Sequence, residues 1–416
     1  MTIDPSSSDT GATASLGGRR PALAVGAFVA AFALFWVTFT SPVAVVLVGR
    51  TAKTLLPATA TVPARNLSAD FNNHTLRTTD RYQAYTAGLD PAMGSLYVMG
   101  SSELSSLARQ NPATFLRDNI SDQDLFLSGR GYVQSLPHAL ELAAVAPELR
   151  TKKVALIVSP QWFVPGGIAP EAFAEVYSAS YYRAAMSSPG LSQATKERLS
   201  TRVSGLLGQA LPGPDSVADL PTPSAVEARA GLVVEALAET QRAVPQVPQA
   251  GPAQPAPGVV PYAEFDWDAA QRDATAEGAA AITTNDFGID DHYYATYVEP
   301  QLSELKDSMA TVDYAGSSPE YDDLDLFLTI ADELGVEVLL ISVPMNAAWY
   351  DYVGYPEQRR LVYYDKIRGI AASRGVTLAD FAADESTDYF LYDVMHLGWK
   401  GWLDVSHACI EFERSA

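Results

Sequence analysis

A serine turn and an Asp-x-x-His pair are the residues whose types and spacing could perform nucleophilic chemistry in this sequence. Ser102 ends a Gly-Ser-Ser sequence that follows the apolar run 96–99 (LYVM), and Asp393 and His396 lie three residues apart near the other end of the chain. On a helical turn this spacing places both side chains on one face, so the carboxylate can accept a hydrogen bond from one imidazole nitrogen. The other nitrogen can then act as a base toward a serine hydroxyl.

Each half of this arrangement also has a structural interpretation. A serine in front of the helical pattern LSSLARQ can be a helix N-cap, Glu103 can be a first-turn acid, and an Asp-x-x-His pair can be a salt bridge. His138 falls in another helical pattern and is expected to pack against the sheet. The serine turn and the Asp-x-x-His pair together, in this chain order, indicate a nucleophile, a base and a carboxylate that orients it. The free N–H groups of the first helix would then stabilise an oxyanion.

Short apolar runs identify the elements that must position these residues. After 96–99 the chain contains 154–159 (VALIVS) and 336–343 (VEVLLISV), with helical patterns between them. Continuously apolar strands are typical of a parallel sheet covered on both faces, so the sequence predicts an α/β fold. Functional groups in such folds lie at the carboxyl ends of the strands, which is where Ser102 is expected.

Composition narrows the class of function. The chain has 416 residues, 48% of them hydrophobic, which allows one large domain or two ordinary ones. Its formal net charge of -21 argues against nucleic acid as a partner, because 49 acidic side chains would repel a phosphate backbone. With Cys409 as its single cysteine, the chain has neither an intrachain disulfide nor a Cys/His zinc pattern, so no metal and no cofactor are expected.

The amino-terminal region predicts a membrane anchor. Residues 21–49 contain no Asp, Glu, Lys or Arg, and they exceed the roughly 20 apolar residues that a spanning helix needs. A secretory signal peptide is the alternative, but its apolar region is usually only about 7–15 residues long. We therefore expect a cytoplasmic tail over 1–20, a single transmembrane helix over 21–49 and a membrane-proximal stalk over 50–90. The charges flanking the helix are nearly balanced, and an inside amino terminus is the simpler orientation.

The remaining residues, 91–416, are expected to form an outer domain on the extracellular side of the cell membrane. Ten of the 27 prolines lie between positions 212 and 261, mixed with alanine, glutamine and glycine. Polyproline-like segments do not join a hydrogen-bonded core. The region from about 186 to 262 is therefore predicted to be a helical insertion followed by a surface segment without chemistry of its own.

The sequence resembles two related families. The Gly-Ser-Ser turn and the late Asp-x-x-His pair resemble the SGNH hydrolases, and several blocks in one order resemble the DltD family of D-alanyl transfer proteins. These blocks are GSSELS (100–105), GRGYVQSLPHAL (129–140), SPQWF (159–163), NDFGIDDHYY (285–294), WYDYVG (349–354) and DVMHLGWKGW (393–402). The resemblance implies an SGNH-hydrolase-like three-layer fold with a parallel sheet. The proline-rich stretch, taken to be longer than is usual in the family, departs from the pattern.

The resemblance also implies a role and a site. The role is D-alanine esterification of teichoic acid by an anchored extracellular protein of a Gram-positive cell wall. Its partners would be a membrane-bound O-acyltransferase of that pathway, a D-alanyl donor and a teichoic acid acceptor. Ser102 takes the nucleophile position of the Gly-Asp-Ser pattern, His396 the base and Asp393 its orienter. The Ser102 N–H, a glycine N–H of 129–131, with Gly131 favoured, and the Gln161 amide would form the oxyanion hole, although the superfamily commonly has asparagine at the last position.

Two further functions and one side-chain alternative stay open. A general SGNH esterase or deacetylase of the cell envelope would use the same residues on another substrate. A scaffold with an inactive triad would deliver a carrier or acceptor to the membrane acyltransferase. Aromatic side chains either line a substrate groove or fill the core; they include Trp162, Trp349, Tyr350 and Trp399.

Overall fold

The computed structural model describes residues 96–217 and 258–415, except for positions 124, 130, 148, 150 and 315. The predicted cytoplasmic tail, transmembrane helix and stalk lie outside the described residues, as does most of the proline-rich stretch. Across the two described ranges, no helix combines the length and the apolar character that a membrane span requires.

A five-stranded, fully parallel sheet forms the centre of the fold and confirms the predicted α/β class. Its strand order is β2-β1-β3-β4-β5. The bounds are β1 Leu96–Met99, β2 Leu125–Ser128, β3 Lys153–Val158, β4 Glu337–Ser342 and β5 Thr377–Asp380. Three of these strands coincide with the apolar runs seen in the sequence. The other two, β2 and β5, were not predicted.

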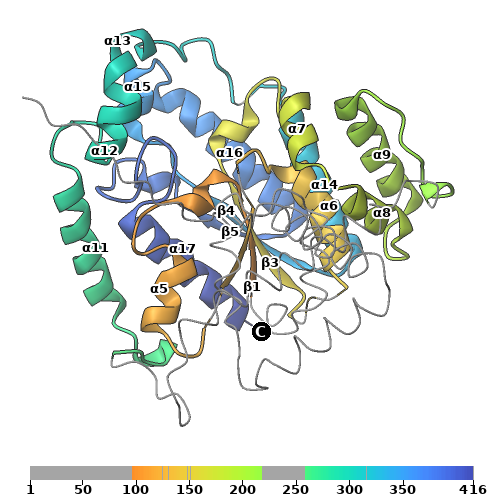
Figure 1. The fold of residues 1–416 in the computed structure, drawn as a ribbon, viewed down its shortest axis with the longest axis horizontal. Coiled ribbons are helices and arrows are strands. Elements are labelled where there is room, and N and C mark those ends of the chain that lie inside the picture. The colour runs from red at the N-terminus through yellow and green to blue at the C-terminus, as the bar shows by residue number, and fades with distance from the viewer. Residues whose placement is uncertain are drawn as a thin grey trace, which may run out of the picture.

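Helices cover both faces of the sheet because successive strand residues point to opposite sides. Leu156 and Leu340 belong to one hydrophobic core, and their neighbours Ile157 and Ile341 belong to the other. The first core is covered by α6 (Ser135–Val145), α8 (Ala179–Ser187), α14 (Pro319–Glu333) and α16 (Glu357–Arg374). The second is covered by α5 (Pro112–Asn119), α11 (Trp267–Ala281) and α17 (Trp399–Arg414), to the left of the sheet in Figure 1.

The remaining elements complete the described chain. They are η2 Ser102–Ser105, η3 Pro160–Phe163, α7 Pro170–Val176, α9 Gln193–Leu207, η6 Tyr262–Glu264, α12 Asp291–Tyr293, η7 Tyr294–Val298, η8 Glu299–Gln301, α13 Leu302–Leu305, α15 Ala347–Tyr352 and η9 Ala382–Asp384. Of these, α9 lies within the stretch predicted as an insertion. Its Leu199 and Val203 are fully buried in the first core, so this helix is an integral part of the helical layer.

The prediction of a helix directly after the Gly-Ser-Ser turn is wrong. Only the four-residue 3-10 helix η2 forms there, and the next α-helix, α5, begins at Pro112, seven residues after η2 ends. Proline fits the first turn of a helix but cannot lie in its interior. The Asn111 side chain donates to the carbonyl of Leu104 at 2.9 Å and closes the intervening loop. The serine turn therefore ends a strand without the dipole of a full helix behind it.

The central strand should be the most sensitive part of the core. Ile157 on β3 is fully buried, so Ile157→Ala should lower the free energy of unfolding by about 2–5 kcal/mol and Ile157→Val by only about 0.5–1.5 kcal/mol. Leu361→Ala on the exposed face of α16 serves as the control, with a change within about 0.5 kcal/mol. Urea unfolding of the three variants measures these differences. Equal losses at positions 157 and 361 would contradict the packing described above.

Candidate active site

Three side chains from the two ends of the described chain meet at the carboxyl end of β1. The His396 Nε2 lies 3.0 Å from the Ser102 Oγ, and the His396 Nδ1 lies 2.7 Å from the Asp393 Oδ2. Since a carboxylate only accepts hydrogen bonds, Nδ1 carries the hydrogen and the Nε2 lone pair faces the serine. This is the arrangement in which an imidazole can take a proton from a hydroxyl.

The segment that carries the base is a closed loop, which corrects the expected helical turn. Residues 391–397 form no helix; Leu391 and Leu397 pair as an isolated antiparallel bridge, and the Tyr392 N–H donates to the His396 carbonyl at 2.8 Å. Asp393 stabilises the loop from inside. Its Oδ1 accepts the N–H groups of Met395 and His396, both at 2.9 Å, which leaves Oδ2 directed at the imidazole. One carboxylate therefore shapes the loop and orients the base.

Burial and nearby charge shift the pKa of His396 in opposite directions. Burial lowers the pKa of the imidazole because it disfavours the charged form. The hydrogen bond and the charge of Asp393, together with the nearby charge of Glu103, raise it, and the net effect is a pKa above the ordinary value of 6.5. The two carboxylates therefore favour the imidazolium, the state that the ring reaches when it accepts a proton.

Further hydrogen bonds hold the serine segment against its neighbours. The Ser106 hydroxyl donates to the Leu397 carbonyl at 2.6 Å and ties the segment after Ser102 to the loop that carries His396. On the other side, the Gly100 N–H donates to the Ser128 carbonyl at 3.0 Å and extends the pairing of β1 with β2. The serine is thus fixed between a strand end and the histidine loop.

Of the proposed oxyanion donors, the glycines differ in their surroundings. Gly129 has φ +143°, and a Cβ there would lie only 1.7 Å from the Gly100 carbonyl oxygen, so only glycine fits at this position. A Cβ on Gly131 would meet nothing within 4 Å. The close approach to the serine turn is therefore made by Gly129, the residue that the sequence interpretation placed second.

Gln161 lies at the end of β3, as expected, on the 3-10 helix η3. Its Nε2 donates to the Glu103 Oε1 at 3.1 Å, and Glu103 follows Ser102 directly. The amide group is therefore oriented by a carboxylate beside the serine.

Two features beside the serine turn were missed from the sequence. Glu103, interpreted as a first-turn acid, is fully buried and accepts the Ser101 N–H at 2.8 Å. His138 is fully buried against the sheet as expected, but its ring also contacts the Gly100 carbonyl and the carboxylate of Glu141. The only signal in the sequence was the polar character of these residues inside apolar helical patterns.

The four aromatic residues considered for a substrate groove occupy the core instead. Trp162 is 1% exposed and Trp349, the most exposed of the four, only 7%. Trp349 contacts Phe287 edge to face, and Trp399 contacts Tyr392 beside the histidine loop. Tyr350 packs against Tyr314 and Tyr355. Core packing accounts for all four side chains.

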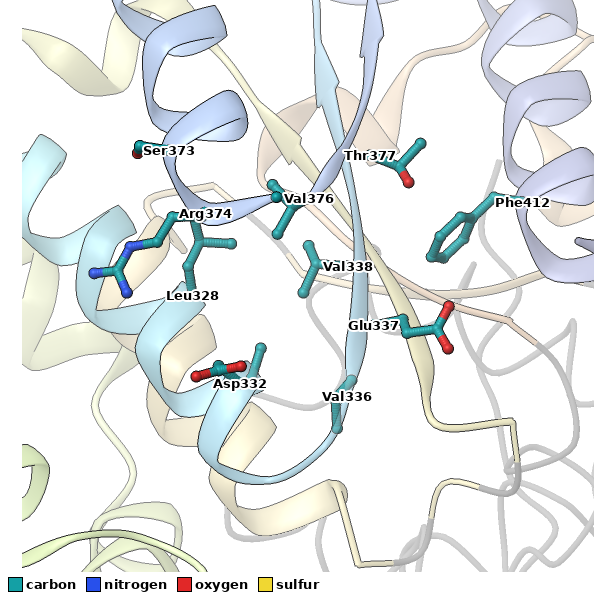
Figure 2. A pocket seen from close by; sticks show the side chains of 12 residues that line it. Leu328, Asp332, Val336, Glu337, Val338, Ser373, Arg374, Val376, Thr377 and Phe412 are labelled. Carbon is teal, nitrogen blue, oxygen red and sulfur yellow. The ribbon is translucent and has the colours of Figure 1, made fainter. Parts of the chain in front are cut away.

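Neither a metal cluster nor the cavity drawn in Figure 2 contributes to this site. No group of three or more His, Cys, Asp or Glu side chains that could hold a metal ion occurs within 96–217 and 258–415. A cavity of about 550 Å³ is lined by Glu337 and Thr377, which begin β4 and β5, and by Arg374 and Phe412 (Figure 2). It lies at the amino ends of the strands, opposite the edge that carries Ser102.

Comparisons with known proteins match most of the chain to one protein family. The sequence model of the DltD protein family matches residues 72–414. The chain is 30% identical to Protein DltD of Bacillus subtilis (strain 168) over 335 residues, which cover 78% of this chain and 83% of that protein. It is 28% identical to Protein DltD of Staphylococcus aureus (strain NCTC 8325 / PS 47), covering 74% and 78%. Protein DltD of Lacticaseibacillus rhamnosus is also 28% identical, covering 77% and 78%.

The electrostatics of the site predict a titration. The His396 ring should be half-protonated at a pH above 6.5 and should lose its proton as pH rises through that point. Asp393→Asn should lower the midpoint, because burial lowers the pKa of the imidazole and less negative charge then remains to raise it. Asp365→Asn removes an exposed carboxylate on α16 and should leave the midpoint unchanged. Histidine NMR titration measures the midpoint in the wild type and in both variants. A midpoint that is the same with and without Asp393 would contradict the assigned cause.

Proposed function

Because the chain belongs to the DltD protein family, we propose that it takes part in the D-alanylation of teichoic acid as a serine acyltransferase or esterase. The observation that carries the proposal is the continuous set of hydrogen bonds from Ser102 through His396 to Asp393. An oriented imidazole beside a hydroxyl is the usual means of making serine a nucleophile at neutral pH. The proposed fold type is that of the SGNH hydrolases, which the parallel sheet and two helical layers support.

The first half of the proposed reaction acylates the serine. His396 Nε2 removes the proton from the Ser102 Oγ, which attacks the carbonyl carbon of a D-alanyl ester or thioester. The resulting oxyanion would be held by the Ser102 N–H, by a glycine N–H of the 129–131 loop and by the Gln161 amide. A single donor of this kind contributes about 3–4 kcal/mol at the transition state. When the tetrahedral intermediate collapses, His396 returns the proton to the leaving group.

The second half transfers the acyl group. A polymer hydroxyl attacks the D-alanyl-Ser102 ester while His396 accepts its proton, and the proton then passes to the Ser102 Oγ as the ester bond breaks. Asp393 orients and stabilises the imidazolium that forms in both halves. Transfer rather than hydrolysis requires the polymer hydroxyl to be better placed than water, a condition that a bound acceptor would meet.

The proposed location follows from residues 21–49. We propose that they anchor the protein in the cell membrane with its amino terminus inside, so that the domain carrying Ser102 faces outward. In this location the site would lie beside a membrane-bound O-acyltransferase of the same pathway. The protein would either receive the D-alanyl group from that partner or deliver the group together with it.

Substitution of the nucleophile tests this proposal. In the presence of a D-alanyl donor, intact-mass spectrometry should detect one D-alanyl group on the wild-type chain and none on Ser102→Ala. Ser101→Ala should retain the added mass, because the hydroxyl that lies at 3.0 Å from the imidazole belongs to Ser102. Acylation of the Ser102→Ala chain would exclude Ser102 as the nucleophile. If no acyl group is found on any variant while D-alanylation proceeds, the protein acts as a scaffold instead.

A further inference from the structure

A buried network lies behind the proposed nucleophile and grips the peptide group that precedes it. The Gly100 carbonyl faces the His138 Nε2 at 2.9 Å, and the Ser101 N–H of the same peptide donates to the Glu103 Oε2 at 2.8 Å. Both side chains are fully buried. A peptide group held at its carbonyl and at its N–H by two ionisable side chains has no freedom to rotate about its flanking bonds.

The histidine in this network is itself oriented. His138 Nδ1 lies 2.9 Å from the Glu141 Oε2, one turn further along α6. Since the Gly100 carbonyl can only accept, His138 Nε2 carries a hydrogen and donates it. The other carboxylate oxygen, Oε1, accepts the Tyr97 hydroxyl at 2.8 Å and the Ser128 hydroxyl. Glu141 therefore links the two strands β1 and β2 to the helix that lies on them.

The network joins the two segments that the proposed reaction brings together. Ser128 precedes Gly129, whose backbone lies so close to the Gly100 carbonyl that a Cβ would clash with it. His138 contacts that same carbonyl from α6. The serine turn and the glycine loop thus meet at one buried carbonyl oxygen, and the contact to His138 fixes their separation.

We propose that His138 and Glu141 are positioning residues for Ser102. Through the Gly100–Ser101 peptide they set the direction in which the Ser102 side chain leaves the backbone, and through Ser128 they set the place of the glycine loop beside it. Glu103 completes the peptide clamp, by which we mean the contacts of His138 and Glu103 to that peptide group. The positioning role rests on the proposed function, because it presumes that Ser102 reacts; the clamp itself is independent of it.

The test uses the full chain in detergent and a small aryl fluorophosphonate, which labels a reactive serine covalently. His138→Leu removes the donor to Gly100 and should slow labelling of Ser102 by about 100-fold, the scale expected when a reacting group moves by about 1 Å. His138→Gln keeps an N–H donor at a similar reach and should recover most of the rate. Such recovery would not occur if the histidine only filled space.

A remote variant controls for general loss of stability. Arg202→Met breaks the ion pair between the half-buried Arg202 on α9 and the buried Asp323 on α14, where Arg202 Nη2 lies 2.8 Å from the Asp323 Oδ2. It should label at the wild-type rate. Glu141→Gln, which preserves shape but removes the carboxylate, provides the test if His138→Leu does not fold, and it should also slow labelling.

Hydrogen exchange of the Ser101 amide, followed by NMR, separates the two proposals. It should be slow in the wild type and faster in His138→Leu and Glu141→Gln. If Ser102 reacts and the His138 and Glu141 variants label at the wild-type rate, positioning is overturned and the nucleophile stands. If wild-type Ser102 does not react, the proposed function fails and positioning with it; the clamp is then judged by Ser101 exchange alone, and unchanged exchange overturns it.

Discussion

The hydrogen bond between the Ser102 hydroxyl and the His396 imidazole joins two segments that are 294 residues apart in the chain. The rest of the fold makes this contact possible. A parallel sheet places the carboxyl end of β1 on the same side as the carboxyl ends of the other strands. The helix α17, which follows the loop that carries His396, packs on one face of this sheet. A second bond, from the Ser106 hydroxyl to the Leu397 carbonyl, holds the same two segments together where they pass each other. The site is therefore a product of long-range packing.

Much of the sheet and the reactive residues could be predicted from the sequence because both leave local signals. Apolar runs bounded by turn residues identified β1, β3 and β4. β5 (TLAD) has a polar residue at each end, and β2 (LFLS) is as short as β1 but was not recognised. The Asp393–His396 spacing was informative although the segment is a loop, because hydrogen bonds that backbone N–H groups donate to Asp393 bring the two side chains together without a helix. The α-helix predicted after Ser102 does not form. Helix propensity is a weak preference that tertiary structure can override, and here a loop leads to α5, which begins at Pro112.

What the sequence could not supply is the set of contacts behind the serine. His138, Glu141 and Glu103 are polar residues in apolar surroundings, and their partners come from β1, β2 and the end of β3. Only the fold brings these groups to the Gly100–Ser101 peptide. A buried polar group costs free energy unless it is hydrogen-bonded, so a network of this kind is stable only when its members are paired. Such pairing also leaves little room for movement in the segment that it holds.

The charges around His396 connect this architecture to the proposed chemistry. The carboxylates that raise the pKa of the imidazole also stabilise the imidazolium formed when it takes the serine proton. The most direct measurement of whether Ser102 and His396 act as one unit is a double-mutant cycle on the hydrolysis of a small D-alanyl thioester by the full chain. The account predicts that Ser102→Ala combined with His396→Ala is no slower than either single variant. Losses that multiply would mean that the two residues act independently and would contradict it.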